Sequence, residues 1–257
     1  MTATRSLIVH PERDALVGAV AHRLESTLRE LLAEKTEVHV VLTGGSVGTD
    51  VLATLGDSPT GRDLDWSRMH VWWGDERWLP SGDDERNDKQ ADDALLGKVG
   101  LLPEHIHRFA ADDGAISLDE AAVQYADELA AHASEGGATP EFDILLLGVG
   151  PDGHVASLFP DRAGVRERDA SVVAVRESPK PPPERLSLTI PSIRRARRVW
   201  LALSGADKAS ALSLALSGAN TVQVPVAGVY GTKETVFFVD STAAEDVPPE
   251  VIANYGQ

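Results

Sequence analysis

Short apolar segments that end in glycine, separated by helical patterns, constrain the fold of this chain most. "VHVVLT" at 38–43, "MHVWWG" at 69–74 and "FDILLLGVG" at 142–150 resemble strands buried on both faces. Residues 11–35 carry leucine and valine at spacings of three and four, the period of an amphipathic helix. Strands that alternate with helices predict an α/β three-layer sandwich, a mostly parallel sheet with helices on both faces.

The remaining elements follow from the same two periods. Further strands are expected at 7–9, 171–175, 185–190, 198–205 and 235–240, and residues 105–109 are expected to form a short strand or strand-like segment. Helices are expected at 49–55, 91–96, 117–132 and 206–216, with Ser117 and Glu120 placed for a capping box. The proline cluster "SPKPPPERL" is expected to be an extended surface loop, because strand patterns continue on both sides of it.

The size and charge of the chain narrow its possible partners. At 257 residues two domains are possible, but we expect a single α/β domain over 1–257. The absence of cysteine excludes disulfides and thiolate chemistry. The N-terminus does not resemble a signal peptide and no apolar run reaches the roughly 20 residues of a membrane span, so a cytoplasmic location is expected. The net charge of −16 disfavours nucleic acid and anionic membranes, and it also repels a phosphorylated metabolite unless basic residues gather locally.

Four polar turns are expected at the carboxyl ends of the predicted strands, on the same edge of one sheet. In open parallel sheets, ligands bind at the carboxyl ends of the strands. In "LTGGSVG", Gly44 and Gly45 allow close backbone approach, and Ser46 with the following amides can hold an anion; the alternative is a tight turn that needs glycine for its conformation alone. In "WWGDERWLP", Asp75 and Arg77 follow a strand rich in tryptophan, which favours a cleft over a simple surface ion pair.

The other two turns supply a histidine and two cations. His154 follows the buried strand in "DILLLGVGPDGHVASLFP", and Asp152 stands two residues before it. Histidine suits general acid–base chemistry because its ordinary pKa lies near neutrality, although a histidine in a turn is more often structural or solvated. Arg185 begins one predicted strand and Lys208 follows another, so each is either a phosphate ligand or a solvated charge.

Three other features point away from competing functions. His105 and His107 could join a metal site, but the sequence shows no third ligand beside them. "RRARR" at 194–198 has no interleaved aromatic residue and belongs to an acidic chain, so a solvated turn is a better interpretation than a nucleic-acid site. The pattern G-x-S-x-G occurs once, in "GGSVG" at 44–48, and there we interpret Ser46 as part of an anion-binding turn and not as a nucleophile.

The four turns, taken together and in this order, resemble the 6-phosphogluconolactonase family. "LTGGSVG", "WWGDERWLP", "DILLLGVGPDGHVASLFP" and "ERLSLTIPSI" carry the resemblance, which extends over essentially the whole chain. It implies a Rossmann-like sheet shared with glucosamine-6-phosphate isomerases and deaminases. It also implies hydrolysis of 6-phospho-D-glucono-1,5-lactone, the second step of the oxidative pentose phosphate pathway, with no redox cofactor and no required metal.

The resemblance also assigns roles to individual residues. It implies that His154 deprotonates the attacking water, with Asp75 and Asp152 as the associated carboxylates; which of the two orients His154 is open. Gly44, Gly45, Ser46, Arg77 and Arg185 match positions of the phosphate pocket. Lys208 resembles a phosphate-binding lysine of the deaminase relatives, and Asn87 matches a substrate contact in a more loosely similar segment. The oligomeric state and the choice between δ and γ lactones are open.

Two rival functions follow from the same residues. A glucosamine-6-phosphate deaminase would need a glutamate after the histidine for ring opening, and "VASLFPD" contains none. A non-catalytic sugar-phosphate-binding domain would keep Gly44, Arg77 and Arg185 but would not need His154. We therefore predict a lactonase that uses general-base catalysis.

Overall fold

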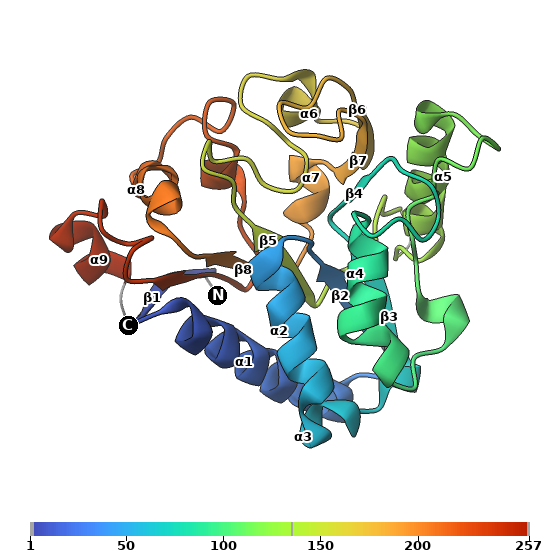
Figure 1. The fold of residues 1–257 in the computed structure, drawn as a ribbon, viewed down its shortest axis with the longest axis horizontal. Coiled ribbons are helices and arrows are strands. Elements are labelled where there is room, and N and C mark those ends of the chain that lie inside the picture. Colours follow the sequence, from blue (N-terminus) through green and yellow to red (C-terminus); the bar gives the residue numbers. More distant parts are fainter. Residues whose placement is uncertain (1–2, 135, 256–257) are drawn as a thin grey trace.

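A six-stranded parallel sheet forms the centre of the computed structural model, which describes residues 3–134 and 136–255. The strand order is β1-β9-β8-β5-β2-β3, and all five neighbouring pairs are parallel (Figure 1). The mostly parallel sheet predicted from the apolar segments is therefore confirmed. The strands are β1 (Thr4–His10), β2 (Val38–Leu42), β3 (Met69–Trp73), β5 (Ile144–Gly148), β8 (Arg198–Leu203) and β9 (Glu234–Asp240).

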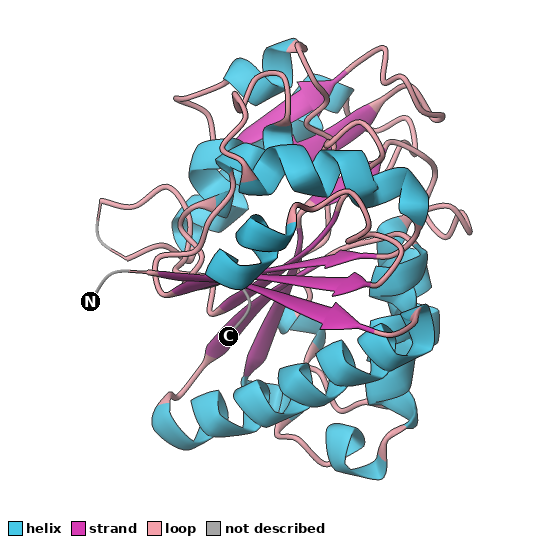
Figure 2. Ribbon diagram, turned by 90° about the vertical axis from the view of Figure 1, so that its left-hand side faces the viewer, coloured by secondary structure: helices cyan, strands magenta, loops and turns pink. Residues whose placement is uncertain are grey.

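Helices cover both sides of this sheet, as Figure 2 shows above and below the central strands. α1 packs against α2, and α2 packs against α4, so these three helices form one layer (Figure 1). α1 buries the stripe of leucine and valine that predicted it. The helices are α1 (Arg13–Glu34), α2 (Ser46–Asp57), α3 (Pro59–Arg62), α4 (Asn87–Ala94), α5 (Leu118–Ala131), α6 (Ala163–Arg166), α7 (Ile190–Ile193), α8 (Ala209–Leu216) and α9 (Pro249–Tyr255), with 3₁₀ turns at Trp66–Arg68, Leu96–Lys98, Pro103–His105, Ala206–Lys208 and Pro225–Gly228.

Of three predicted helix starts, one is confirmed and two differ from the prediction. Ser117 caps α5 by accepting a hydrogen bond from the Glu120 amide, and the Glu120 carboxylate accepts one from the Ser117 amide, so the predicted capping box is present. α2 begins at Ser46, three residues earlier than predicted, which places this serine in the first helical turn. The helix predicted at 206–216 starts with a 3₁₀ turn and becomes α-helical only from Ala209.

A second, antiparallel sheet of three short strands was not predicted. β4 (Asp75–Arg77), expected as a loop, pairs with β7 (Arg185–Leu188), and β7 pairs with β6 (Val172–Val175). The expectation that these segments belong to one edge of one sheet is wrong. Gly74 ends β3 and its carbonyl accepts a hydrogen bond from the Leu188 amide at 2.9 Å, so the chain turns out of the central sheet there. Apolar alternation identifies a strand but does not encode its partner.

Residues 105–109, predicted as strand-like, form only one bridge beside the edge strand β3. A 3₁₀ turn occupies Pro103–His105, and Ile106 then bridges Val71 in the parallel sense. The His107 amide donates to the Val71 carbonyl at 2.9 Å. Proline at the start of the 3₁₀ turn lacks an amide proton, which limits pairing to this short stretch.

The interior beneath the strand ends is apolar and closely packed. β3 is buried along its whole length, and Trp72, Trp73 and Trp200 are among the largest fully buried side chains. Such an interior holds the strand ends in fixed positions, because closely packed side chains resist displacement. Within the described ranges, no helix combines the length and the apolar character needed to cross a membrane.

Candidate active site

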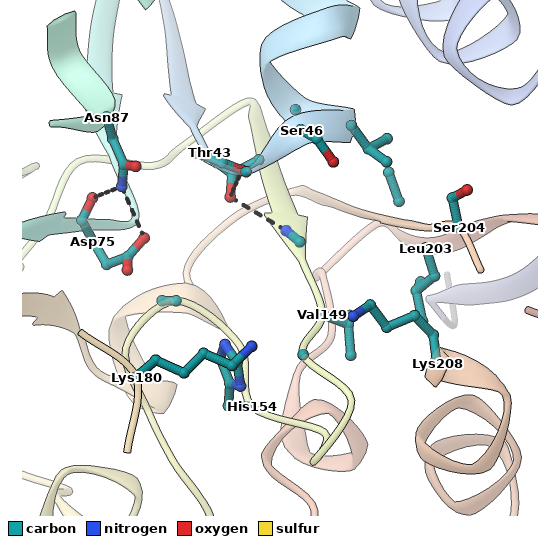
Figure 3. A pocket seen from close by; sticks show the side chains of 18 of the residues that line it. Thr43, Ser46, Asp75, Asn87, Val149, His154, Lys180, Leu203, Ser204 and Lys208 are labelled. Atoms are coloured by element: carbon teal, nitrogen blue, oxygen red, sulfur yellow. Dashed lines mark hydrogen bonds between the residues drawn. The ribbon is translucent and has the colours of Figure 1, made fainter. Parts of the chain in front are cut away.

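The strand-end turns meet at one cavity of about 450 Å³. It opens where β2, β5 and β8 end, and β4 and the first turns of α2 and α4 complete its wall (Figure 3). Eight of the ten predicted site residues line it: Gly44, Gly45, Ser46, Asp75, Arg77, Asn87, His154 and Lys208. The other two, Asp152 and Arg185, are outside this lining, and each contacts a residue that belongs to it.

The glycine turn brings the start of α2 to the cavity. Gly45 has φ of 82°, a conformation that favours glycine, and it precedes the first helical residue. Thr49 donates the first backbone bond of the helix, to the Gly45 carbonyl at 2.9 Å, so the preceding amides of residues 46–48 are free to bind an anion. A twelve-residue helix also places the positive end of its dipole here.

Gly44 is needed for a second reason, the close approach of Asn87. A Cβ atom at Gly44 would lie 1.9 Å from Asn87 Oδ1. Asn87 Nδ2 donates to the Asp75 carbonyl at 2.9 Å, and both residues lie on the same side of the cavity (Figure 3). Any larger residue at position 44 would therefore displace Asn87 from the cavity wall.

Asp75 connects the central sheet to the antiparallel sheet. Its Oδ2 accepts a hydrogen bond from Ser157 Oγ at 2.7 Å, and the Ser157 amide donates to Ser187 Oγ on β7 at 3.2 Å. The Asp75 side chain is buried but reaches the cavity. In the described part of the chain it forms no hydrogen bond with His154, so the geometry gives it no orienting role toward that ring.

Glu76 positions Asn87 rather than facing the ligand. Burial raises the pKa of Glu76 to about 7, although the charge of Arg86 acts in the opposite direction. Its carboxylate accepts hydrogen bonds from the amides of Arg77 and Asn87, both at 2.7 Å, and of Asp88 at 2.9 Å. Glu76 thus caps the start of α4 from outside the helix, which fixes Asn87 at the cavity.

His154 is held by Asp152 and by two close packing contacts. Asp152 Oδ1 lies 2.5 Å from His154 Nδ1. Burial disfavours the carboxylate, but the hydrogen bond and charge of His154 outweigh it and keep the pKa of Asp152 below its ordinary value. A Cβ at Gly150 would lie 2.0 Å from the imidazole, and the Phe159 ring packs on it with ring centres 4.5 Å apart.

This pairing determines which nitrogen of His154 is available. A carboxylate accepts only, so Nδ1 donates its proton to Asp152 and Nε2 carries the free lone pair. His154 lines the cavity, with 13% of its side chain exposed. This arrangement could act as a general base, because a carboxylate sets the tautomer and the orientation of the ring.

Lys180 is a cavity residue that the sequence did not suggest. It belongs to the proline cluster expected to be a plain surface loop, and its side chain points into the cavity (Figure 3). Burial lowers the pKa of the Lys180 amine.

Arg185 supports the Lys180 loop. Its guanidinium donates to the carbonyls of Lys180 at 3.2 Å, Pro181 at 2.8 Å and Pro182 at 3.2 Å. The residue is 7% exposed, and its guanidinium lies over the Phe159 ring. The structure thus places Arg185 under the loop that carries Lys180, and Arg77, its β4 partner in register, at the cavity itself.

Lys208 comes from the turn after β8. Its Nζ lies 2.7 Å from Asp207 Oδ2, and only 19% of its side chain is exposed. Asp240 fixes the turn by accepting hydrogen bonds from Ser204 Oγ at 2.5 Å and from the Gly205 amide. Lys208 and Ser204 lie on the side of the cavity opposite Asp75 and Asn87 (Figure 3).

The fold and this cavity define an α/β protein with a strand-end cavity lined by Arg77, Lys180, Lys208 and the start of α2. The family model described as "Glucosamine-6-phosphate isomerases/6-phosphogluconolactonase" matches residues 11–238. The chain belongs to this family.

Individual relatives are similar over nearly the whole chain. The 6-phosphogluconolactonase of Streptomyces coelicolor is 49% identical over 252 residues, which cover 96% of this chain and 97% of the relative. The 6-phosphogluconolactonase of Mycobacterium tuberculosis is 44% identical over 245 residues, 95% of this chain and 98% of the relative. The structure of the 6-phosphogluconolactonase from Thermotoga maritima matches with a TM-score of 0.80 at 26% identity, covering 93% of this chain and 100% of that one.

Proposed function

We propose that this chain hydrolyses 6-phospho-D-glucono-1,5-lactone to 6-phospho-D-gluconate, the second step of the oxidative pentose phosphate pathway, with His154 as general base. The observation that carries the mechanism is the Asp152–His154 pair in a cavity that also contains Lys180, Lys208 and the start of α2. The identity with relatives named 6-phosphogluconolactonase supports the substrate.

The phosphate is bound by the side of the cavity opposite Asp75. The amides that begin α2 and the side chain of Ser46 supply hydrogen-bond donors, and the ammonium groups of Lys180 and Lys208 supply charge. Arg77, on the same strand as Asp75, adds a further cation to the cavity, and Arg185 acts through the loop that carries Lys180. These groups overcome the repulsion that a net charge of −16 exerts on a phosphorylated ligand.

The lactone ring then lies between the phosphate ligands and the Asp75–Asn87 wall. His154 Nε2 takes a proton from water, and the water oxygen attacks the carbonyl carbon of the lactone. The ring C–O bond of the tetrahedral intermediate breaks, and the proton held by His154 passes to the departing ring oxygen. Asp75 and Asn87 contact the sugar hydroxyls, which orients the reacting carbon against the water.

Asp152 maintains the reactive tautomer throughout. It keeps the proton of the neutral ring on Nδ1 and stabilises the imidazolium that forms when Nε2 is protonated. No covalent enzyme intermediate is needed, because a lactone is an activated ester that water attacks directly. The chain has no cysteine, which agrees with direct water attack.

The deaminase rival is disfavoured by the residues at the cavity. A monomeric glucosamine-6-phosphate deaminase matches with a TM-score of 0.78 at 20% identity, a likeness of fold alone. None of the described residues that line the cavity is a glutamate. Incubation with glucosamine 6-phosphate should release no ammonia above the background, and release at the rate of lactone hydrolysis would contradict the proposal.

The direct test of substrate choice is hydrolysis of freshly made 6-phosphogluconolactone, corrected for its spontaneous rate. Unphosphorylated gluconolactone at equal concentration is the control. We expect hydrolysis of the phosphorylated lactone to be strongly preferred, because remote phosphate binding orients the reacting carbon. Equal kcat/KM values for both lactones would contradict the phosphate site.

The single-domain organisation over 1–257 and a cytoplasmic location are also proposed. The single domain is supported by the site itself, since β4 of the antiparallel sheet supplies Asp75 and Arg77 to a cavity at the ends of the central strands. The lack of cysteine supports the location.

A further inference from the structure

Five of the eight histidines form a second cluster, at the outer edge of the central sheet. His39 on β2 and His70 on β3 are partners in register, and their rings stack with centres 4.6 Å apart. His105 stacks on His70 with centres 3.9 Å apart, and His107 follows on the segment that runs beside β3. His132 stands at the end of α5. Within the described ranges, none of these residues lines the cavity of the active site.

A chain of hydrogen bonds fixes the protons of His107 and His70. His107 Nδ1 lies 2.6 Å from Glu128 Oε1, so it donates to the carboxylate and leaves a lone pair on Nε2. His70 Nδ1 lies 2.9 Å from His107 Nε2 and must be the donor in that bond. His70 Nε2 then carries a lone pair instead of a proton.

This lone pair of His70 has no hydrogen-bond partner among the described residues. His70 is 5% exposed, and its Nε2 is fully buried. The nearest charged group is Glu37 Oε2 at 3.9 Å, beyond hydrogen-bond distance, and two acceptors do not bond without a proton. A buried unpartnered polar atom is costly, which points to a ligand that changes the protonation of His70.

A metal ion between His70, His107 and His132 would replace two acceptors that face each other, His70 Nε2 and the Glu37 carboxylate, by an N–H group that faces the carboxylate. One nitrogen from each of the three rings lies within 4.8 Å of the other two. With a metal on His70 Nδ1, the proton of the neutral ring moves to Nε2, where it faces the Glu37 carboxylate. The metal replaces the hydrogen bond between His70 and His107 and takes the lone pairs of both.

The other two ligands already have the outer contacts that metal-bound histidines need. His107 Nδ1 donates to the Glu128 carboxylate, and His132 Nδ1 donates to the Glu128 carbonyl at 3.0 Å, so each ring presents Nε2. Such partners fix the tautomer and orientation of a metal-binding imidazole.

A competing set, Glu37 with His39 and His70, is less suitable. Trp72 Nε1 donates to His39 Nδ1 at 3.2 Å, so the proton of the neutral His39 ring lies on Nε2. That ring has no second lone pair to offer. The set built on His107 and His132 does not have this conflict.

We propose that His70, His107 and His132 form a site for a divalent transition-metal ion, with Zn²⁺ as the fitting ion. Three neutral imidazoles suit Zn²⁺ far better than Mg²⁺ or Ca²⁺, which prefer oxygen ligands. The fourth position is left to solvent, on the side of exposed His132. The ion would join β3, the segment beside it and the end of α5, and so stabilise the edge of the sheet.

The test is metal binding to the full-length protein after removal of metal with a chelator. Zn²⁺ is titrated by calorimetry, and Co²⁺ is used as a spectroscopic probe because histidine coordination changes its visible absorption. We expect one ion per chain. His132→Gln should weaken Zn²⁺ binding at least about tenfold, and Glu128→Gln, which removes an outer contact, should weaken it roughly 10- to 100-fold.

Two variants control for other histidine sites. His22→Gln alters an exposed histidine of α1 outside the cluster and should bind Zn²⁺ like the unaltered protein. Asp152→Asn tests binding at the active-site histidine and should also leave Zn²⁺ affinity unchanged. His132 is exposed, so its variant is expected to fold, and circular dichroism verifies this. Absence of saturable binding to the unaltered protein, unchanged affinity in His132→Gln, or loss of affinity in Asp152→Asn would each overturn the proposal.

Discussion

Two histidine–carboxylate pairs in this molecule have nearly the same geometry and different surroundings. His154 lies 2.5 Å from Asp152, and His107 lies 2.6 Å from Glu128, in both cases through Nδ1. The Nε2 of His154 has a free lone pair in a cavity that also contains lysines. The Nε2 of His107 instead accepts a hydrogen bond from His70, and the Trp72 ring stacks on the His107 ring. The carboxylate selects the tautomer in both places, and the neighbours of the second nitrogen are why we propose proton transfer for His154 and metal binding for His107.

Replacing each carboxylate with an amide should lower catalytic turnover at the first pair and not at the second. Asp152→Asn removes the acceptor that keeps the proton on Nδ1, so kcat for the lactone should fall by at least about tenfold, with KM little changed. Glu128→Gln makes the same change at the other pair and should leave kcat within about twofold. Steady-state kinetics on both variants checks this, and an equal effect of the two substitutions would contradict the assignment of roles.

Removing single cations from the cavity should affect binding more than turnover. Lys180→Ala and Lys208→Ala should each raise KM for the phosphorylated lactone roughly 10- to 150-fold, because a hydrogen bond to a charged group contributes about 1.5–3 kcal/mol. Hydrolysis of unphosphorylated gluconolactone should not change. Lys98→Ala, which removes an exposed partner of Asp57 outside the cavity, is the control. An increase in KM for the unphosphorylated lactone would contradict the proposal that these lysines bind the phosphate.

The pKa of Lys180 predicts a pH dependence of phosphate binding. Because burial lowers this pKa, the ammonium loses its proton at a lower pH than an ordinary lysine does. Binding of 6-phosphogluconate should therefore weaken as pH rises into the alkaline range. Calorimetry should detect this loss in Lys208→Ala but not in Lys180→Ala. The same pH profile in both variants would show that another group titrates.

The packing around His154 can be tested with a pair of glycine substitutions. Gly150→Ala places a Cβ 2.0 Å from the imidazole and should destabilise the fold by about 1–3 kcal/mol while it displaces the base. Gly18→Ala lies within α1, where an added Cβ meets no atom within 4 Å, and should stabilise by about 0.5–1 kcal/mol. Denaturant unfolding gives the free energy of unfolding of both variants. Equal changes in the two variants would contradict the close packing of Gly150 against His154.

Much of the active site could be predicted from the sequence because it is built from turns at strand ends. Glycine turns after apolar strands identified the start of α2 and His154, and parallel pairing brings such ends to one edge of a sheet. Lys180 was missed because its position depends on a loop whose carbonyls are held by the Arg185 side chain. No local pattern encodes such a contact.

The histidine cluster was missed for a related reason. The sequence places His105 and His107 together, but their neighbours come from β2, β3 and α5. His39 and His70 become partners only through the register of two parallel strands, 31 residues apart in the chain. The antiparallel sheet shows the same limit, since β4 is three residues long and its pairing with β7 spans more than a hundred positions.

The central claim is that His154 is the general base, and the most direct measurement is the kcat of His154→Ala for 6-phosphogluconolactone. After correction for spontaneous hydrolysis, kcat should fall by at least about 100-fold, because general-base catalysis contributes about 10²–10⁴-fold. Binding of 6-phosphogluconate should be retained, since the phosphate ligands are unaltered. His107→Gln, checked for folding, should keep its turnover. Unchanged turnover in His154→Ala would contradict the account.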